Sequence, residues 1–346
     1  MQCKLRISFW ALMAGSLLVK IAHAEEVTAL GEKSLTSVSV SEQLGEMSEK
    51  LASENLTIEN GKVEIVKNGK VSKGTFIGQY GLQSVEHRGQ TEKVKVHGGE
   101  QIVVGDGSYA YNSEIYGEGE TSGQQNVYSD GAAFFTNVMS GGEQNLSKWL
   151  GDEGGLAVDT VVYAAGVQNV FAGGRANTVT LEKGALQRVY AGGRVETLTI
   201  NSEANALVYA GATLEGKIKV NGSGKLYLYA GDNGQQTNAE EIILKGKESQ
   251  LYSIATKIDG SSSHIQKLSS NGRVVFTSDS HDSQQSHPYY SLLYIGNLSG
   301  SIHFSLNVNF AESYGDHLII EIRRREPYSK CYGFWYRNYK IFFQSI

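Results

Sequence analysis

Two stretches of the sequence carry residue types that could bind a phosphate or a metal ion. GATLEGKI at 211–218 is similar to a phosphate-binding loop, but Ile218 stands where such a loop needs Ser or Thr to ligate magnesium. His281, Asp282 and His287 could approach a metal ion from one loop, but their spacing matches no ligand pattern and no further ligand lies nearby. We therefore expect neither a metal site nor a cofactor site.

Serine-hydrolase chemistry has no support in the sequence. The G-x-S-x-G turn that presents a nucleophilic serine does not occur, nor does the GDSG of serine proteases. GDGS, GDEG and GDNG begin at Gly105, Gly151 and Gly231, where they suit turns between repeated units. We expect a protein that is not an enzyme, with no catalytic residues.

Aromatic residues recur at nearly even spacing and suit binding by surface contact. The stretch 166–194, GVQNVFAGGRANTVTLEKGALQRVYAGGR, repeats one phrase after 19 residues. The candidate binding residues are the aromatics at this position, namely Tyr128, Phe171, Tyr190, Tyr209 and Tyr229. Tyrosine offers contact area and a hydroxyl with little side-chain entropy to lose, which suits contact with protein or carbohydrate. A purely structural stack is an equal alternative, because repeats place like residues together.

An aliphatic residue precedes each aromatic position and marks the repeat. Steps of 18 to 24 residues join the markers Ile65, Val85, Val103, Val127, Leu146, Val170, Val189, Val208 and Leu228. Short pieces with alternating apolar and polar residues favour strands, and the glycines between them supply positive φ for corners. Such a unit buries no core alone, but it does so when stacked on its neighbours.

We therefore predict an all-β fold, a right-handed parallel β-helix of about 19-residue repeats. Roughly 13 coils over residues 61–322, stacked at the spacing of a β ladder, would be about 60 Å long. We expect the markers to form an internal ladder. The aromatics should then face outward, with rows of Asn, Gln and Thr on the same flat, weakly acidic surface; the reverse phase stays open. A sandwich of antiparallel hairpins is the alternative, but a near-constant return favours the solenoid.

The repeat resembles a known family. The pattern G-x-Q-x-V-[FY]-x-G-G-x-A-x-T-x-T, clearest at 166–180, resembles the passenger repeats of AIDA-type autotransporter adhesins. The resemblance is strongest over 123–200 and degenerate over 61–122 and 201–250. It implies an AIDA-like repeat β-helix over 61–250, type V secretion, and a C-terminal outer-membrane barrel in intact members.

The segment 251–322 has a second resemblance. GNLSGSIHFSLNVNFAESYGDHLIIE at 296–321 resembles the pertactin-like end of such a passenger. One strand is predicted by apolar residues that alternate with polar ones, at Ile302, Phe304, Leu306, Val308 and Phe310. AESYGD should turn the chain into a second strand, HLIIE.

The N-terminus predicts export. Lys4 and Arg6 precede an apolar run, and Ala22 and Ala24 stand at the spacing of a signal-peptide cleavage site. The run falls short of the ~20 residues that a membrane-spanning helix needs. We expect residues 1–24 to be a signal peptide removed after Ala24.

Two polar segments flank the repeats. Residues 25–60 are predicted to be a leader or N-terminal cap, in which Leu44, Met47 and Leu51 could share one face of a short helix. Residues 261–290, rich in Ser, Gln and His, are expected to form a long loop.

The last 24 residues, 323–346, are atypical. They carry six basic residues and one acidic residue, with many aromatics. Two membrane strands at most would fit here, whereas the smallest barrels use about eight. A shifted reading frame and a membrane- or partner-binding tail both explain the composition, and we favour the frameshift. A truncated chain without a barrel is expected in the periplasm, and the intact family at the cell surface.

These observations favour an exported adhesin whose partner is a host surface protein, a glycan or another copy of itself. The overall charge is −5. Residues 1–24 carry +3 and residues 323–346 carry +5, so residues 25–322 carry about −13, which argues against nucleic acid or anionic lipid as partner. A secreted host-signalling ligand is one alternative. A polysaccharide-active enzyme is another, and it would need the recurring Glu182, Glu196 and Glu215 to lie together.

Overall fold

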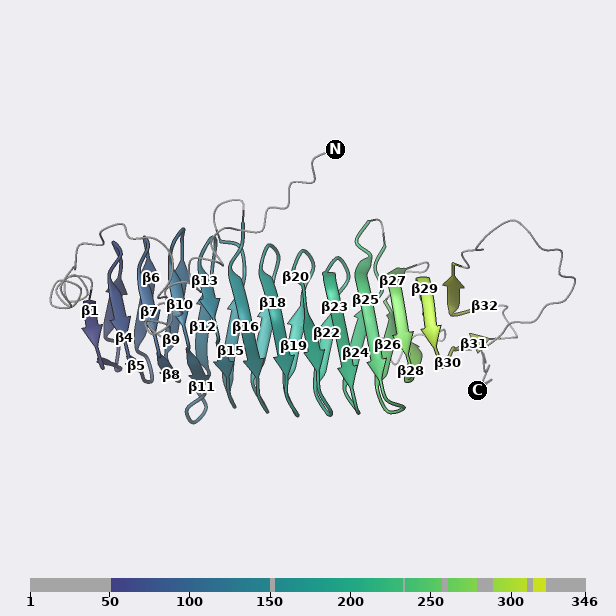
Figure 1. Cartoon of the computed structure of the whole chain (residues 1–346), viewed down its shortest axis with the longest axis horizontal. Coiled ribbons are helices and arrows are strands. Elements are labelled where there is room, and N and C mark those ends of the chain that lie inside the picture. Colours follow the sequence, from purple (N-terminus) through teal and green to yellow (C-terminus); the bar gives the residue numbers. More distant parts are fainter. Residues whose placement is uncertain are drawn as a thin grey trace, which may run out of the picture. The chain divides into compact units, whose positions relative to one another are not determined.

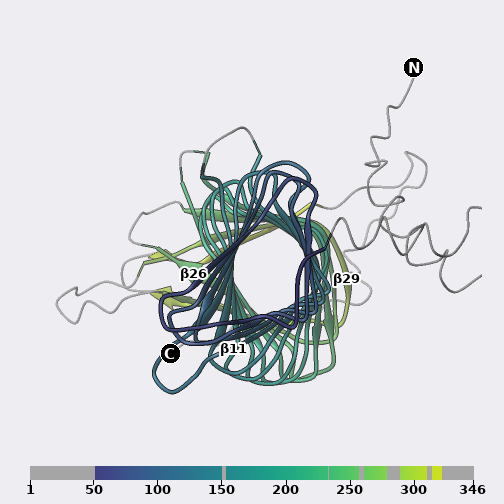
Figure 2. The same ribbon diagram turned by 90° about the vertical axis from the view of Figure 1, so that its left-hand side faces the viewer.

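The described part of the chain forms a parallel β-solenoid in a computed structural model. The structure describes residues 51–149, 153–232, 234–256, 261–278, 289–309 and 314–321. Successive coils lie side by side in Figure 1, and the view along the axis in Figure 2 shows that they follow nearly one outline. The strand pairs of both large sheets are parallel. The predicted β-helix is therefore confirmed and the antiparallel sandwich is wrong, while the right-handed sense of the coil stays a prediction.

Two sheets build the solenoid. The 12-stranded sheet contains β3 (Val63–Val66), β6 (Leu82–Glu86), β9 (Glu100–Val104), β12 (Gly123–Val127), β15 (Gly142–Leu146), β17 (Val167–Val170), β19 (Leu186–Val189), β22 (Asn205–Val208), β24 (Lys225–Tyr229), β26 (Gln250–Ala255), β28 (Arg273–Ser278) and β30 (His303–Ser305). The 19-stranded sheet contains β1 (Leu51–Glu54), β2 (Thr57–Ile58), β4 (Val71–Lys73), β5 (Phe76–Ile77), β7 (Gln90–Glu92), β8 (Lys95–His97), β10 (Tyr109–Tyr111), β11 (Glu114–Tyr116), β13 (Ala132–Phe134), β14 (Asn137–Val138), β16 (Leu156–Val162), β18 (Arg175–Leu181), β20 (Arg194–Val195), β21 (Leu198–Ile200), β23 (Thr213–Asn221), β25 (Thr237–Lys245), β27 (Ser262–Ser270), β29 (Leu292–Gly300) and β33 (His317–Ile320). Within these residues, no helix has the length and hydropathy to cross a membrane.

The aliphatic markers form the predicted internal ladder. Val127 pairs with Leu146, Leu146 with Val170, and the row continues through the 12-stranded sheet with every member fully buried. One marker was misplaced by a residue: Val66 pairs with Val85 and is buried, whereas Ile65 points outward and is 52% exposed. A shift of one residue exchanges the two faces of a strand, so in VEIV at 63–66 either Ile65 or Val66 could face inward.

The solenoid has about 11 turns rather than 13. The first pairs of the 12-stranded sheet repeat after 18 or 19 residues, but Arg273 pairs with His303 after 30. Longer returns near the C-terminal end therefore reduce the number of turns. Eleven steps at about 4.8 Å each correspond to about 53 Å along the axis.

A buried ladder of glutamines runs beside the aliphatic ladder. Each side-chain nitrogen donates to the oxygen of the glutamine one coil before it, at 2.6 to 2.8 Å, along the row Gln83, Gln101, Gln125, Gln144, Gln168 and Gln187. All six side chains are fully buried, so the expectation that the repeat's glutamines face solvent is wrong. Each glutamine lies two residues before its marker, and strand alternation puts both on the same face.

Both ends of the glutamine ladder differ from its middle. Gln83 donates to the Glu64 carboxylate at 2.7 Å, which closes the row at the first coil. At the other end Ala206 follows Gln187 in register, and Gln187 Oε1 has no hydrogen-bond partner in the described residues. Hydroxyl groups from the opposite side of the coil also donate to the ladder, as Thr136 does to Gln125 and Thr160 does to Gln144.

The paired glycines mark corners, as predicted. Gly173 and Gly192 have φ of 78° and 76°, a left-handed conformation that glycine adopts without strain. The next residue in each case must be glycine for a steric reason, because a Cβ at Gly174 would lie 2.3 Å from the Leu146 carbonyl oxygen. The motif therefore needs both glycines for different reasons.

A row of left-handed residues bends the 19-stranded sheet. In seven successive coils the residue at one position has φ between 53° and 65°, at Asn55, Gly74, Lys93, Asn112, Phe135, Asp159 and Thr178. The first five donate their backbone N–H to the next coil, as Lys93 does to the Tyr111 carbonyl at 2.9 Å. The sheet thus turns a corner without losing its hydrogen bonds.

Both polar segments contain strands that the sequence did not predict. The first coil begins at Leu51, where part of the expected helix is strand β1, and β2 lies inside the expected leader. The expected loop at 261–290 contains β27 and β28, whose inward positions hold small Ser or apolar residues. The serine-rich composition suggested a loop, but serine is small enough to fit inside a coil. Ser261 and Ser263 are fully buried there, although their hydroxyls have no hydrogen-bond partner among the described residues.

The segment 296–321 follows the predicted alternation in part. Ile302, Phe304 and Leu306 are buried, but the chain forms two short strands, β30 and β31 (Val308–Asn309), rather than one. β31 pairs antiparallel with β32 (Tyr314–Gly315), and HLII forms β33 as predicted. Several predictions lie outside the described residues. They are the signal peptide over 1–24, the part of the expected helix before residue 51, the inward position of Phe310, the tail over 323–346 and the histidines of the 281–287 stretch.

Asp316 holds the C-terminal turn together. Its carboxylate accepts hydrogen bonds from the backbone N–H groups of Ser291 at 3.0 Å and Asn307 at 2.8 Å. Burial raises the pKa of this carboxyl, and the two backbone hydrogen bonds oppose that rise. The side chain therefore connects three chain segments from one buried position.

We predict that Gln144→Leu destabilises the solenoid by about 1–3 kcal/mol, because Gln168 then loses its acceptor inside the coil. The midpoint of urea unfolding, followed by circular dichroism, measures this. Gln124→Leu is the control, since Gln124 lies on the neighbouring strand β12 of the same sheet but faces outward. An unchanged midpoint in Gln144→Leu would show that the ladder adds no stability.

Candidate functional site

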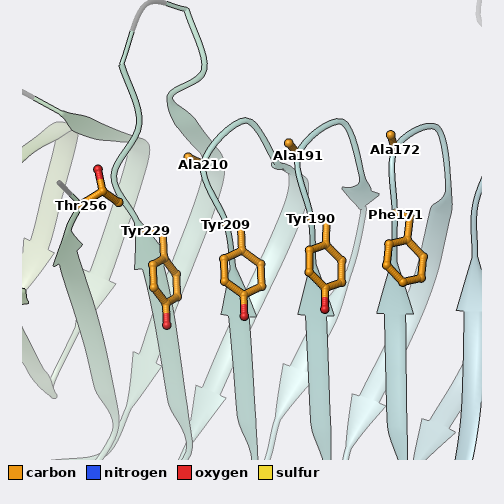
Figure 3. A pocket seen from close by; sticks show the side chains of 8 residues that line it. All are labelled: Phe171, Ala172, Tyr190, Ala191, Tyr209, Ala210, Tyr229 and Thr256. Atoms are coloured by element: carbon orange, nitrogen blue, oxygen red, sulfur yellow. The ribbon is translucent and has the colours of Figure 1, made fainter. Parts of the chain in front are cut away.

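The aromatic residues of the repeat form a row on the outside of the solenoid. Phe171, Tyr190, Tyr209 and Tyr229 each directly follow a buried member of the aliphatic ladder, so strand alternation turns them outward. Figure 3 shows the four rings side by side, with the three tyrosine hydroxyls pointing the same way. Ring centroids are 4.8, 5.0 and 4.8 Å apart along the row, and the planes meet at 6°, 12° and 29°. The predicted phase, valines inward and aromatics outward, is confirmed.

A groove of about 630 Å³ follows this row. Each aromatic residue is followed by an alanine, and Ala172, Ala191 and Ala210 form a parallel row of small side chains at the corner. Thr256 lies at the end beside Tyr229. The alanines leave room beside the rings, so the groove exists because the motif alternates a large side chain with a small one.

Parallel stacking limits what the row can contact. Because neighbouring rings cover each other's faces, the row presents ring edges and hydroxyls, and a ring face is free only at an end. Phe171, at one end, is 36% exposed. Stacking of a sugar on a ring needs a free face, so most of this row suits contact through hydroxyls and edges instead.

Tyr128 does not belong to the row. Ser147 occupies the aromatic position in the coil between Tyr128 and Phe171, because Leu146 pairs with both Val127 and Val170. Tyr128 instead meets Trp149 edge-on, with centroids 5.2 Å apart, and Trp149 is 62% exposed. Four of the five predicted aromatics therefore form one stack, and the fifth, Tyr128, pairs with Trp149 instead.

Other aromatic contacts escaped the sequence analysis. Tyr227 and Tyr252 stack at 4.6 Å on the outer face of the 12-stranded sheet, two residues before the row position. On the other sheet Tyr111 stacks on Phe134 at 5.0 Å. Burial, with a smaller effect of Tyr109, raises the pKa of Tyr111 to about 12, so its phenol stays neutral at physiological pH. Irregular return lengths hid these pairs.

The structure does not gather the residues that could do chemistry into one site. The three glutamates do not lie together, and the phosphate-loop-like stretch is part of a repeat. Glu196 and Glu215 lie on adjacent coils, because Val195 pairs with Leu214, and Glu215 pairs with Arg194 at 3.1 Å. Glu182 follows Leu181, which pairs with Ile200 at the end of β21, whereas Glu196 precedes the start of β21. Glu182 is therefore separated from Glu196 by the length of this strand. The 211–218 stretch is a corner and a strand. Among the described residues, no group of three His, Cys, Asp or Glu side chains could hold a metal ion.

Comparison with known proteins supports the fold. No protein-family model matches the sequence, and no curated protein matches it. Among solved structures, the chain is similar to the TibC-catalysed, hyper-glycosylated fragment of TibA that spans residues 55–350 of that protein. The TM-score is 0.53 with 24% identity, over 79% of this chain and 98% of the fragment. At this identity the likeness shows a shared β-solenoid fold.

We predict that the stacked rings stabilise each other. A double-mutant cycle with Tyr190→Leu and Tyr209→Leu should give a coupling free energy of about 0.5–1.5 kcal/mol. Urea unfolding of the four proteins measures it. The cycle of Tyr190→Leu with Tyr252→Leu, whose rings are not in contact, should give a value near zero. Equal couplings in the two cycles would contradict the stacking.

Proposed function

We propose that this chain is the exported passenger of a surface adhesin, which acts by presenting the side of its solenoid to a partner. The observation that carries the proposal is the repeat itself: a motif that resembles AIDA-type passengers builds a solenoid similar in fold to the TibA fragment. The solenoid places its aromatic row and groove on an outer face. Contact along this face is the activity that the arrangement supports.

Export is part of the proposal. A basic, apolar and then small-residue sequence over 1–24 is typical of a signal peptide, and cleavage after Ala24 would leave a chain without cysteine up to Cys331. Proteins that cross a second membrane unfolded benefit from the lack of disulfides. The proposed location is therefore the cell surface.

The proposed partners are a host surface protein, a glycan or another copy of the chain. The row offers hydroxyls and ring edges over four coils, which suits an extended partner better than a small molecule. An enzyme acting on polysaccharide is the weaker candidate, because Glu182 is separated from Glu196 and Glu215 by a strand. A secreted signalling ligand would use the same outer face.

The direct test uses beads coated with the purified mature chain. We expect the beads to bind cultured epithelial cells or to aggregate with each other, and the quadruple change of Phe171, Tyr190, Tyr209 and Tyr229 to Ser to reduce this by about tenfold. The matched control changes Tyr109, Tyr111 and Phe134, which lie on the other sheet, to Ser. Retained folding is checked by circular dichroism.

Beads that neither bind cells nor aggregate would contradict the proposal. Release of reducing ends from an acidic polysaccharide by the same protein would instead support the enzyme. Equal loss in the two variants would show that the aromatic row is not the contact surface.

A further inference from the structure

The charges on the outer face of the 12-stranded sheet are segregated along the solenoid. From β6 to β15 the charged residues that face outward are all acidic, namely Glu86, Glu100 and Glu143. From β17 to β30 the strands carry no acidic residue and instead hold Arg188, Lys225, Arg273 and His303. The negative charge of the whole body therefore says little about this C-terminal half of the face.

Three basic residues of this half make no ion pair within the described residues. On the 19-stranded sheet, lysine and arginine pair with glutamate in the next coil, in the pairs Lys73–Glu92, Lys95–Glu114, Arg194–Glu215 and Lys217–Glu241. Within the described part of the chain, Arg188, Lys225 and Arg273 make no ion pair, although Arg188 reaches the Asn169 side-chain oxygen at 3.5 Å. Arg175, Lys219, Lys245 and Lys267 of the 19-stranded sheet make no ion pair within the described residues either. The C-terminal half of the 12-stranded sheet differs in that its strands carry no acidic residue beside the three cations.

Register places these cations beside aromatic side chains. Lys225, Gln250, Arg273 and His303 follow one another across successive coils. Two residues further along the strands on the same face lies the Tyr227–Tyr252 stack, and the aromatic row follows after two more. At about 4.8 Å per coil, Lys225 and Arg273 lie about 9.6 Å apart, roughly the length of a disaccharide. Lys225 and Arg273 therefore border a strip of hydroxyls and ring edges, and Arg188 lies in line with Tyr227, two coils before it.

We propose that this basic aromatic face, formed by Arg188, Lys225, Arg273, Tyr227 and Tyr252 with the neighbouring aromatic row, binds an acidic polysaccharide. Carboxylate or sulfate groups would meet the lysine and the arginines, for which they are the natural partners. Sugar hydroxyls would meet the tyrosine hydroxyls and the Gln250 amide, which already accepts a hydrogen bond from Tyr252 at 2.7 Å. The inference rests on the proposed adhesin function and names its partner.

A polysaccharide fits better than two other partners. A second copy could oppose the basic half with its acidic half, but Glu100 and Glu143 already accept hydrogen bonds from Asn126 and Asn169. A nucleic acid would need more phosphate contacts than three cations supply. A linear chain with at least one anionic group per disaccharide can meet Lys225 and Arg273, two coils apart, with successive repeats.

The test measures binding of the purified mature chain to immobilised heparin, alginate and neutral dextran by biolayer interferometry. We expect binding to the two polyanions, weakening with salt, and none to dextran. Binding to heparin alone would assign the ligand to sulfated polysaccharides. Binding to both heparin and alginate would show that carboxylate groups also serve. Lys225→Gln with Arg273→Gln should weaken binding about tenfold.

The matched control is Lys73→Gln with Lys217→Gln, which removes the same charge from the other sheet and should change binding by less than about twofold. Equal loss in both double variants, or no loss in either, would overturn the assignment. So would a Lys225/Arg273 variant that loses self-association in sedimentation but keeps polysaccharide binding. If the chain binds no polyanion while coated beads still adhere to cells, this inference fails and the adhesin proposal stands.

Discussion

Every feature of this protein depends on the in-register parallel ladder of backbone hydrogen bonds between coils. Because each strand pairs with the equivalent strand of the next coil, like residues stand above like residues at about 4.8 Å. A motif repeated in sequence thereby becomes a line of identical side chains in space, as the fully buried row from Val127 through Leu146 to Val170 shows. The surface of the solenoid consequently consists of rows of side chains along its axis, and a partner contacts such a row rather than a closed pocket.

The glutamine ladder shows how this constraint changes the chemistry of a core. A single buried amide is costly unless its donors and acceptor are paired. In register, each glutamine finds an identical neighbour, and hydroxyls such as that of Thr160 fill the remaining acceptor positions. Such a network disfavours any other register, because a shifted coil would leave buried amides unpaired.

The sequence predicted the periodic features and missed the irregular ones. Even returns place Phe171, Tyr190 and Tyr209 in one row, and this stack follows from the sequence alone. Strand alternation also predicts that Gln168 faces inward, since it lies two residues before Val170. Its polarity suggested a solvent-exposed position instead. The Tyr227–Tyr252 stack could not be predicted, because a return of 25 residues hides their equivalence. The segregation of charge along the outer face becomes visible only when the strand register shows which charged residues face outward in each coil.

The central claim, that consecutive repeats stack in parallel register, is tested most directly by disulfide cross-linking. In a Cys331→Ser background, Thr180→Cys with Thr199→Cys places two thiols on register partners of adjacent coils. The account predicts a rapid disulfide on mild oxidation, and none for Thr180→Cys with Lys219→Cys, whose positions lie two coils and about 9.6 Å apart. Cross-linking of the second pair but not of the first would contradict the register, and with it the aromatic row and the basic face.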